Sequence, residues 1–361
     1  MNPGGTGGCF ASIVGALAAA RRSDLVSVEA GTYNETVLID DTRITIQGAG
    51  AGATTIAGLV YLTQSTATIS GVTILGGKVV VRIDSSLTLR DSIVSGSPGH
   101  GVELVDKHRV VIERSSITGS AHAGVYVCCR GSVSIVDSTI SGNQAGGVVA
   151  AGNNSRAKVT VVGSTISGNS TAGSGGGIRT ANGGANLKVI RSTISGNTAS
   201  GDGGGIYLNA NEFRRSTLRL ESSTVAGNSA AISGGTGGIV SEFGGGTGNF
   251  VRIDNSIVAD NLSDAAPDCR LEAGGLSTVG TTSLIETPCP EPPTLSGGAA
   301  LLSGDPVLAP LADNGGPTET HALLAGSPAL AAQTKGALCK VPDQRGVTRI
   351  APCDLGAYEL P

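Results

Sequence analysis

Tryptophan is absent from the 361 residues, aromatic residues amount to 2%, and charged residues to 14%. A core built on large rings is therefore excluded, and aliphatic side chains must fill it. The net charge of −4 provides no basic stripe along the chain, so we expect no nucleic-acid partner. No apolar run reaches the roughly 18 residues of a membrane span, because Arg21 and Arg22 close the run from Phe10 to Ala20.

The first residues, Met1 to Gly4, lack the basic and apolar regions of a secretion signal, so the protein is either cytoplasmic or begins after a removed leader. The seven cysteines favour export. Four of them form two short-range pairs in loop-like segments, and we predict the disulfides Cys269–Cys289 and Cys339–Cys353, with buried free thiols as the alternative. The spacing leaves Cys9 open, and the adjacent Cys128 and Cys129 are interpreted as packing or solvent-facing thiols. No cysteine–histidine cluster indicates a zinc site.

Internal repetition is the strongest signal in this glycine-rich chain, which has 57 glycines. A motif of the form Ser-Thr-Ile-Ser-Gly-Asn recurs from Ser92 to Asn261 at intervals that grow from roughly 23 to 33 residues, the range of solenoid repeats. Its aligned aliphatic residues are Val94, Ile117, Ile140, Ile166, Ile194, Val225 and Val258.

Each repeat holds two further short apolar segments. One alternates with period two just before the motif, as in Leu87 and Leu89, and the other follows a glycine after it, as in Val102. Such strands bury themselves only if successive coils stack. The sequence therefore predicts an all-β, right-handed parallel β-helix with three short strands per coil. Helical periodicity and a leucine signature are missing, which argues against leucine-rich and α-helical solenoids.

Asparagine ends most of the repeats. Asparagine tolerates the left-handed backbone of sharp corners, and stacked asparagines hydrogen-bond along an axis. We therefore assign a structural role to one column of side chains, which consists of Asn143, Asn169, Asn197, Asn228 and Asn261.

Both ends of an open β-helix need covers. Residues 1–24 are predicted to form an N-terminal cap with a short helix after Phe10, residues 25–262 the β-helix, and residues 263–361 a loop-rich C-terminal cap stapled by the disulfides. The segment from Val26 to Val37 and the segment Ile44-Thr-Ile-Gln-Gly-Ala-Gly50 resemble the opening of pectin-lyase-like β-helix proteins.

The C-terminal segments Asp305–Pro317, Asp343-Gln-Arg-Gly346 and Cys353-Asp-Leu-Gly-Ala-Tyr-Glu359 resemble the choice-of-anchor Q region of bacterial surface proteins. This resemblance implies an extracellular or cell-surface protein and assigns His321 a structural role. It does not imply an activity, because the β-helix hosts lyases, hydrolases, adhesins and stalks. We expect a monomer.

One strand of each coil is flanked on both sides by segments of variable length, and this arrangement predicts a groove with a flat β floor. Its outward residues are Glu103, Tyr126, Val149, Arg179, Tyr207 and Val240. Tyrosine rings stack on sugars and arginine binds carboxylate or sulfate in a bidentate fork, so this column suits an extended glycan. Asn209 and Arg214 from a neighbouring loop are predicted to add contacts.

Candidate catalytic residues are Glu103, His122, Arg179 and Lys188. Inverting hydrolysis needs two nearby carboxylates; the predicted floor offers only Glu103, and Asp106, Glu113 and Asp137 near that end are its possible partners. A lyase would use Arg179 or Lys188 as its base, together with acidic ligands for Ca²⁺, although no acidic cluster surrounds either residue. His100 and His122 fall on successive coils and form a second candidate base pair.

The hypothesis that follows is a secreted or cell-surface β-solenoid that binds a polysaccharide or a host-matrix glycan in the groove, or serves as a stalk or adhesin, without a cofactor. The alternative is a polysaccharide lyase or glycoside hydrolase that acts in the same groove.

Overall fold

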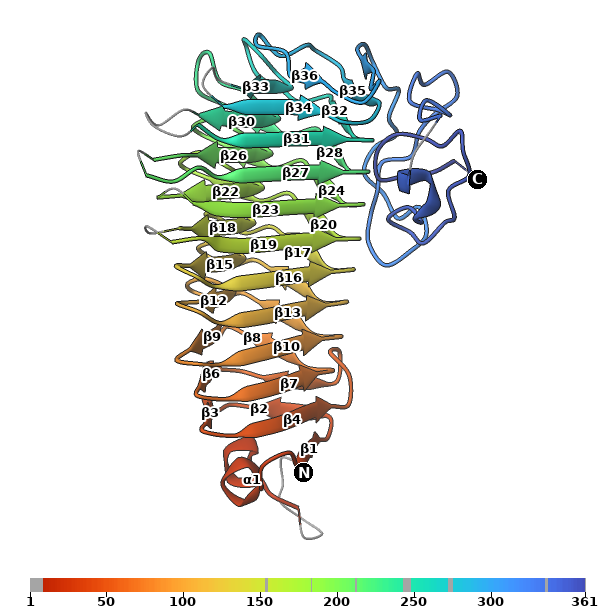
Figure 1. The fold of residues 1–361 in the computed structure, drawn as a ribbon. Coiled ribbons are helices and arrows are strands. Elements are labelled where there is room, and N and C mark those ends of the chain that lie inside the picture. The colour runs from red at the N-terminus through yellow and green to blue at the C-terminus, as the bar shows by residue number, and fades with distance from the viewer. Residues whose placement is uncertain are drawn as a thin grey trace.

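The structure, a computed structural model, describes residues 9–152, 155–182, 184–211, 213–242, 248–271, 275–334 and 337–360. Coils of the chain stack along one axis (Figure 1). Each full coil contributes one strand to each of three parallel sheets, which run side by side along that axis. The chain is therefore a right-handed parallel β-helix with three short strands per coil, as predicted. No helix in these segments is long and apolar enough to cross a membrane.

Sheet A contains the longest strands. They are β1 (Leu25–Val28), β4 (Arg43–Gly48), β7 (Thr66–Ser70), β10 (Ser86–Arg90), β13 (Arg109–Glu113), β16 (Ser132–Val136), β19 (Ala157–Val162), β23 (Ala185–Ile190), β27 (Thr217–Glu221), β31 (Phe250–Asp254), β34 (Leu276–Val279) and β36 (Thr294–Leu295).

Sheet B carries the repeated Thr-Ile-Ser segments. Its strands are β2 (Gly31–Tyr33), β5 (Thr54–Ile56), β8 (Thr73–Leu75), β11 (Ile93–Ser95), β14 (Ser116–Thr118), β17 (Thr139–Ser141), β20 (Thr165–Ser167), β24 (Thr193–Ser195), β28 (Thr224–Ala226), β32 (Ile257–Ala259), β35 (Ser283–Ile285) and β37 (Leu301–Leu302).

Sheet C forms the third side. Its strands are β3 (Val37–Asp40), β6 (Val60–Thr63), β9 (Val79–Arg82), β12 (Val102–Leu104), β15 (Val125–Cys128), β18 (Val148–Ala151), β22 (Ile178–Ala181), β26 (Ile206–Asn209), β30 (Ile239–Glu242) and β33 (Cys269–Leu271). A small sheet between sheets B and C contains β21 (Ser170–Thr171), β25 (Thr198–Ala199) and β29 (Ser229–Ala230).

The core is a set of aliphatic columns inside the three sheets. Ile140, Ile166, Ile194 and Val225 pair in register on consecutive coils of sheet B, and all four are fully buried. Parallel in-register stacking brings the same aliphatic position of every coil to the same place, so one hydrophobic cluster runs from Ile13 to Cys289.

The predicted asparagine column is a buried hydrogen-bonded ladder. The amide nitrogen of Asn169 donates to Oδ1 of Asn197 at 2.9 Å, and Asn197 donates in the same way to Asn228 at 2.9 Å. The left-handed backbone, however, belongs to the residue before each asparagine, for example Gly196 at φ 63°. Glycine makes the corner before four of the five asparagines, and Asp260 makes it before Asn261. Asparagine fastens the corner to the next coil, which corrects the corner role predicted for the asparagines.

The N-terminal end is covered by α1 (Ile13–Ala19), as predicted. Ser12 caps the helix by accepting a hydrogen bond from the backbone nitrogen of Gly15. The carboxylate of Glu35 accepts hydrogen bonds from the nitrogens of Ile13 and Val14 at 2.7 and 3.0 Å, so it also complements the helix dipole.

The C-terminal end of the stack lies beyond residue 262, the limit predicted for the β-helix, because β33 to β37 add rungs as far as Leu302. The disulfide Cys269–Cys289 is present, and both cysteines belong to the main core. The disulfide Cys339–Cys353 is present in the following region.

Residues 305–360, here called the lateral region, lie against the side of the solenoid rather than over its end (Figure 1). Oε1 of Gln344 accepts a hydrogen bond from Thr193 at 2.7 Å, and its amide nitrogen donates to Thr165 at 3.0 Å. The nitrogen of Ala357 donates to the hydroxyl of Thr224 at 3.1 Å. The outward threonines of sheet B therefore hold the lateral region in place.

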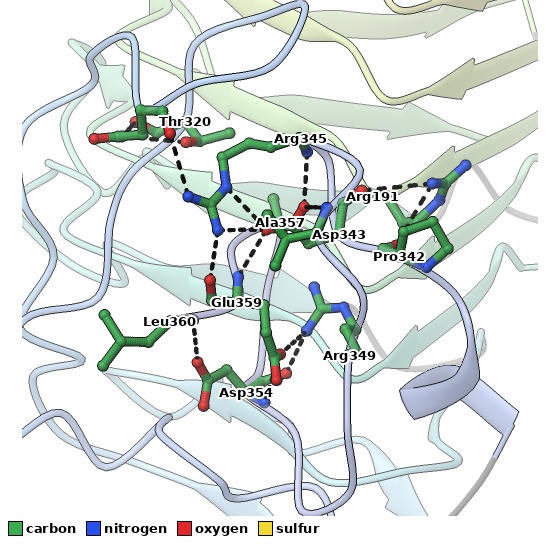
Figure 2. A network of polar contacts seen from close by, with 12 residues as sticks. Arg191, Thr320, Pro342, Asp343, Arg345, Arg349, Asp354, Ala357, Glu359 and Leu360 are labelled. Carbon is green, nitrogen blue, oxygen red and sulfur yellow. Dashed lines mark hydrogen bonds and ion pairs between the residues drawn. The ribbon is translucent and has the colours of Figure 1, made fainter.

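The C-terminal motifs at residues 343–346 and 353–359 form one buried polar network (Figure 2). Arg345 pairs with Asp343 at 2.8 Å, and Arg349 pairs with Glu359 at 3.0 Å. Glu359 also accepts a hydrogen bond from the backbone nitrogen of Asp354 at 3.0 Å. Motifs that lie apart in the sequence thus act as a single structural unit. A small second core around Leu323 and Leu355 packs beside it.

Candidate functional site

The predicted outward column exists in the expected register on sheet C. Glu103, Tyr126, Val149, Arg179, Tyr207 and Val240 are paired in this order on six consecutive strands. The column continues in both directions, to Val80 and Tyr61 before Glu103 and to Arg270 after Val240. Tyr61 and Arg270 were missed, although the same spacing, continued by one or two coils, would have found them.

Glycine-rich loops fold down onto this floor. A Cβ atom added at Gly175 would lie 2.4 Å from Cβ of Arg179, and one added at Gly203 would lie 2.9 Å from Cβ of Tyr207. Both glycines also have a positive φ, a backbone conformation that residues other than glycine rarely adopt. Val149 is only 2% exposed although it points away from the core. The loops therefore cover the short residues of the column, and the long polar ones remain half-buried.

Glu103 is committed to two cations that the sequence did not link to it. Lys78 contacts one carboxylate oxygen at 2.8 Å and Arg82 the other at 3.1 Å. Burial acts to raise the pKa of Glu103, but the hydrogen bond and charge of Lys78 outweigh it, and the pKa lies below its usual value. Glu103 is thus an ionised, paired carboxylate, which is unsuited to act as a general acid.

His100 lies beside Glu103 within a small aromatic cluster. Its ring stacks on Tyr126 with a centroid separation of 4.6 Å, and it meets the exposed ring of His122 edge-on at 5.2 Å. Nδ1 of His100 is buried and has no hydrogen-bond partner within the described segments. Burial lowers the pKa of His100, so the imidazole is neutral near pH 7. The two histidines on successive coils do come together, as the sequence predicted.

Arg179 is the unpaired cation of the groove. It forms no ion pair with any residue that the structure describes, and its buried Nε has no hydrogen-bond partner. Its neighbour one coil further, Tyr207, is half-buried like Arg179 itself. An unpaired guanidinium next to a tyrosine ring can bind an anionic group of a ligand.

The far end of the groove holds a second ion pair. Asp202 accepts hydrogen bonds from the backbone nitrogens of Gly203 and Thr236 at 3.0 and 2.7 Å, and its carboxylate pairs with Arg270. Asp202 precedes β26, whereas Glu103 lies in β12, with β15, β18 and β22 between them. These two carboxylates are therefore several coils apart and cannot act on one glycosidic bond.

The other hydrolase partners considered for Glu103 lie elsewhere. Glu113 ends β13 in sheet A and pairs with Arg90 at 3.6 Å. Asp137 occupies the left-handed turn between sheets A and B. Asp106 follows β12, in a left-handed turn with φ 74°.

The remaining predicted residues are only partly in the groove. Lys188 lies in β23 of sheet A, so it cannot share a catalytic site with Arg179 on sheet C. Asn209 ends β26, and its carbonyl accepts a hydrogen bond from Ser216 at 2.9 Å. Arg214 lies in the loop that follows, where its backbone nitrogen donates to Asn211 at 2.8 Å.

Cys128 and Cys129, whose pairing the sequence left open, are bonded to each other. The pair lies at the end of β15, and Cys129 has a positive φ of 66°. A disulfide is expected to stabilise a fold mainly by closing a loop of the unfolded chain. A bond between adjacent cysteines closes no such loop, so this criterion did not predict it.

Within the described segments, three carboxylates lie close enough to share a cation. Oxygens of Asp260, Glu286 and Asp305 lie within 4.8 Å of one another. Burial and the two neighbouring acids raise the pKa of Asp260. The group follows β32 of sheet B, away from the column of sheet C. It does not provide the calcium ligands that a lyase would need in the groove.

Acidification is expected to destabilise the fold through its buried histidines. Burial lowers the pKa of His100, His108 and His321. Below about pH 6.5 the unfolded chain therefore takes up protons that the folded chain does not. His321 bridges Ala309 and Ser195 at 2.7 and 2.8 Å. Stability should fall as the pH decreases below that value, until the folded histidines themselves become protonated.

Thermal unfolding of wild type and His321→Gln between about pH 7.5 and 5.5 tests this expectation, in the range where unperturbed histidine titrates. The variant should show a smaller decrease in Tm than wild type over this range. Equal slopes for His321→Gln and wild type would remove His321 from the explanation.

The comparisons with known proteins agree on the fold. The family model "Right handed beta helix region" matches residues 33–194. Pectate lyase Pel9A is similar in structure, with a TM-score of 0.56 and 12% identity over 100% of this chain and 94% of that one. The A-module of a mannuronan C-5 epimerase from Azotobacter vinelandii has a TM-score of 0.56 and 13% identity over 81% of this chain and 93% of that one. No curated protein matches the sequence significantly.

Proposed function

We propose that this protein is a secreted or cell-surface solenoid that binds an extended acidic polysaccharide along the outward column of sheet C. The observation that carries the proposal is Arg179, a half-buried guanidinium with no ion-pair partner within the described segments, set in line with Tyr126 and Tyr207. A carboxylate or sulfate would satisfy this cation, and the tyrosine rings would pack against sugar faces.

The other charges of the column fit the same ligand. Lys78 and Arg82 share the single carboxylate of Glu103, so this end of the groove retains an excess positive charge. Stacked coils repeat about every 4.8 Å, so the floor offers its groups at regular intervals along a linear chain. Pectate and mannuronan, after which the two structurally similar enzymes are named, are acidic linear polysaccharides of this kind.

Export is supported by the disulfides, which persist mainly in oxidising compartments. The C-terminal motifs that resemble a choice-of-anchor Q region are consistent with a position at the cell surface. In this proposal the lateral region is a structural module that leaves the groove of sheet C open.

A second candidate function, β-elimination of a uronate chain, is favoured by His100. In that reaction a neutral base takes the proton from C5, the C4–O bond breaks, the electron pair forms a C4=C5 double bond, and an acid protonates the leaving oxygen. His100 offers a neutral imidazole that stacks on the ring of Tyr126 and meets His122 edge-on, and Lys78 offers a cation for the uronate. Hydrolysis is less favoured, because Lys78 and Arg82 hold Glu103 as a paired carboxylate with a lowered pKa, which does not suit a general acid.

Arg179→Ala is expected to weaken binding of a size-defined oligogalacturonate about 10-fold or more, the loss of one charge-assisted hydrogen bond. Isothermal titration calorimetry measures the change, and Lys340→Ala, an exposed lysine of the lateral region, controls for the loss of one charge. Unchanged affinity in Arg179→Ala would refute the groove. Release of ultraviolet-absorbing unsaturated ends by wild type, abolished in His100→Ala, would instead establish the lyase.

A further inference from the structure

A row of basic side chains runs along the outward face of sheet A, on a different side of the solenoid from the groove. Lys188, Arg219 and Arg252 occupy the same register position on β23, β27 and β31. Lys158 lies one coil earlier in a neighbouring column, and Arg156 precedes its strand. We call these five residues the basic face.

Two of these cations are held in place by buried acids on their own strands. Arg219 pairs through Nε with Glu221, and Arg252 pairs through Nε with Asp254 at 2.6 Å. The two carboxylate side chains are only 9% and 3% exposed, whereas the arginine side chains are 51% and 37% exposed. An arginine has five N–H donors, so a bond at Nε leaves donors of the guanidinium for a ligand.

The same geometry on adjacent coils orients both guanidinium groups alike. Residues two apart in a strand share a face, which is why each arginine meets the acid of its own strand. The hydrogen bond to Asp254 raises the pKa of Arg252, so this group stays fully charged. A Cβ atom at Gly280 would lie 2.2 Å from Nη2 of Arg252, so the absence of a side chain at Gly280 makes room for the guanidinium.

Three cations of the basic face are not neutralised. Arg156, Lys158 and Lys188 are exposed and form no ion pair within the part of the chain that the structure describes. With Arg219 and Phe250 they line a shallow depression of about 490 Å³ on the sheet. The chain as a whole has a net charge of −4. The positive charge of the basic face is therefore a local feature of this surface and does not reflect the overall charge of the protein.

We propose that the basic face is a second polysaccharide-binding site, which takes a linear acidic glycan laid along the solenoid axis. Its cations recur once per coil, about 4.8 Å apart, a spacing close to the length of one sugar residue in an extended chain. The surface is a flat sheet with Phe250 as its single aromatic ring, which suits a linear chain better than stacked bases or a lipid interior.

The site does not depend on the proposed groove, because sheets A and C share no strand. A protein with both sites would hold two glycan chains, or two stretches of one chain, on different faces. Two weak contacts linked in this way raise the overall affinity for a long polymer well above that of either face.

Titration of wild type with a size-defined oligogalacturonate tests the proposal, with a heparin oligosaccharide as a second acidic glycan. The charge reversal Lys158→Glu/Lys188→Glu changes only exposed side chains and leaves the buried ion pairs intact. Its matched control is Lys107→Glu/Lys340→Glu, which makes the same change of net charge at exposed lysines elsewhere. We expect two binding sites in wild type and the control, and one site in the reversal variant, with the lost site weakened at least about 10-fold.

Three results would overturn the basic face as a glycan site. The first is unchanged stoichiometry in the reversal variant, and the second is an equal loss in the control, which would indicate a nonspecific charge effect. The third is failure of wild type to bind either acidic glycan while duplex DNA or anionic vesicles bind through Lys158 and Lys188. Arg179→Ala distinguishes the two proposals, because its lack of effect refutes the groove while the response to charge reversal still reports on sheet A.

Discussion

Glu359→Ala should lower the free energy of unfolding of the lateral region by about 3 to 5 kcal/mol, the usual effect of removing one partner from a buried ion pair. The side chain of Arg349 is fully buried, and Glu359 is its carboxylate partner at 3.0 Å. Without Glu359 the guanidinium keeps only backbone carbonyls as partners, among them that of Asp354 at 2.7 Å. The backbone nitrogen of Asp354 loses its acceptor at the same time.

Urea unfolding together with amide hydrogen exchange measures this effect. Exchange should speed up first in the lateral region, because coils such as those of β10 and β13 keep their own core. Glu319→Ala is the matched control, since Glu319 lies in the same region with an exposed side chain. The double variant Glu359→Ala/Arg349→Met should be more stable than Glu359→Ala alone, because it no longer leaves a buried charge unpaired. A double variant that is less stable by the sum of both effects would contradict the ion-pair explanation.

The stacked columns could be predicted because the β-helix repeats one local environment. Val94, Ile117 and Ile140 align in the sequence, and an in-register parallel sheet makes the same three residues neighbours in space. The alignment that identified the core therefore also placed Glu103, Tyr126 and Arg179 on one outward column. The position of a residue within the repeat therefore predicts which sheet it belongs to and which residues lie next to it on neighbouring coils.

The lateral position of residues 305–360 could not be derived in this way. Thr139 and Thr165 occupy equivalent positions of the repeat, yet Thr139 is half-buried and Thr165 is fully buried beneath the lateral region. Nothing in the repeat distinguishes the two coils. The detectable signal comes later, where Ile257 and Leu284 replace the outward polar residue and need an apolar cover.

The ion pairs of the groove were also beyond prediction. The column gives the register of Glu103, but its partners Lys78 and Arg82 lie at the two ends of β9, one coil earlier. Whether such side chains meet depends on the path of the loops, which the spacing of the repeats does not determine. Lys188 and Arg179 were both named as candidate lyase bases from residue type alone, but they belong to different strands of their coil.

Asn197→Ala is the second substitution with a large expected effect, about 3 kcal/mol or more. Oδ1 of Asn197 accepts from both the backbone and the side-chain nitrogen of Asn169, at 3.0 and 2.9 Å. Its own amide donates to the carbonyl of Ile166 at 2.9 Å and to Asn228 at 2.9 Å. Alanine leaves these buried groups unpaired, and each unsatisfied group costs about 1 to 3 kcal/mol. Chemical denaturation measures the loss, and Asn34→Ala at an exposed position is the control.

Gly196→Ala tests whether the glycine and the asparagine have separate roles at this corner. Apart from the two adjacent residues, no atom of the described residues lies closer than 3.9 Å to a Cβ at Gly196, so the cost should come only from the left-handed backbone at φ 63°. That cost is about 1 to 2 kcal/mol, below the loss expected for Asn197→Ala. A larger destabilisation from Gly196→Ala than from Asn197→Ala would mean that backbone shape, rather than the hydrogen-bonded ladder, fastens one coil to the next. The hydrogen bonds of the buried asparagines would then be secondary to the shape of the corner.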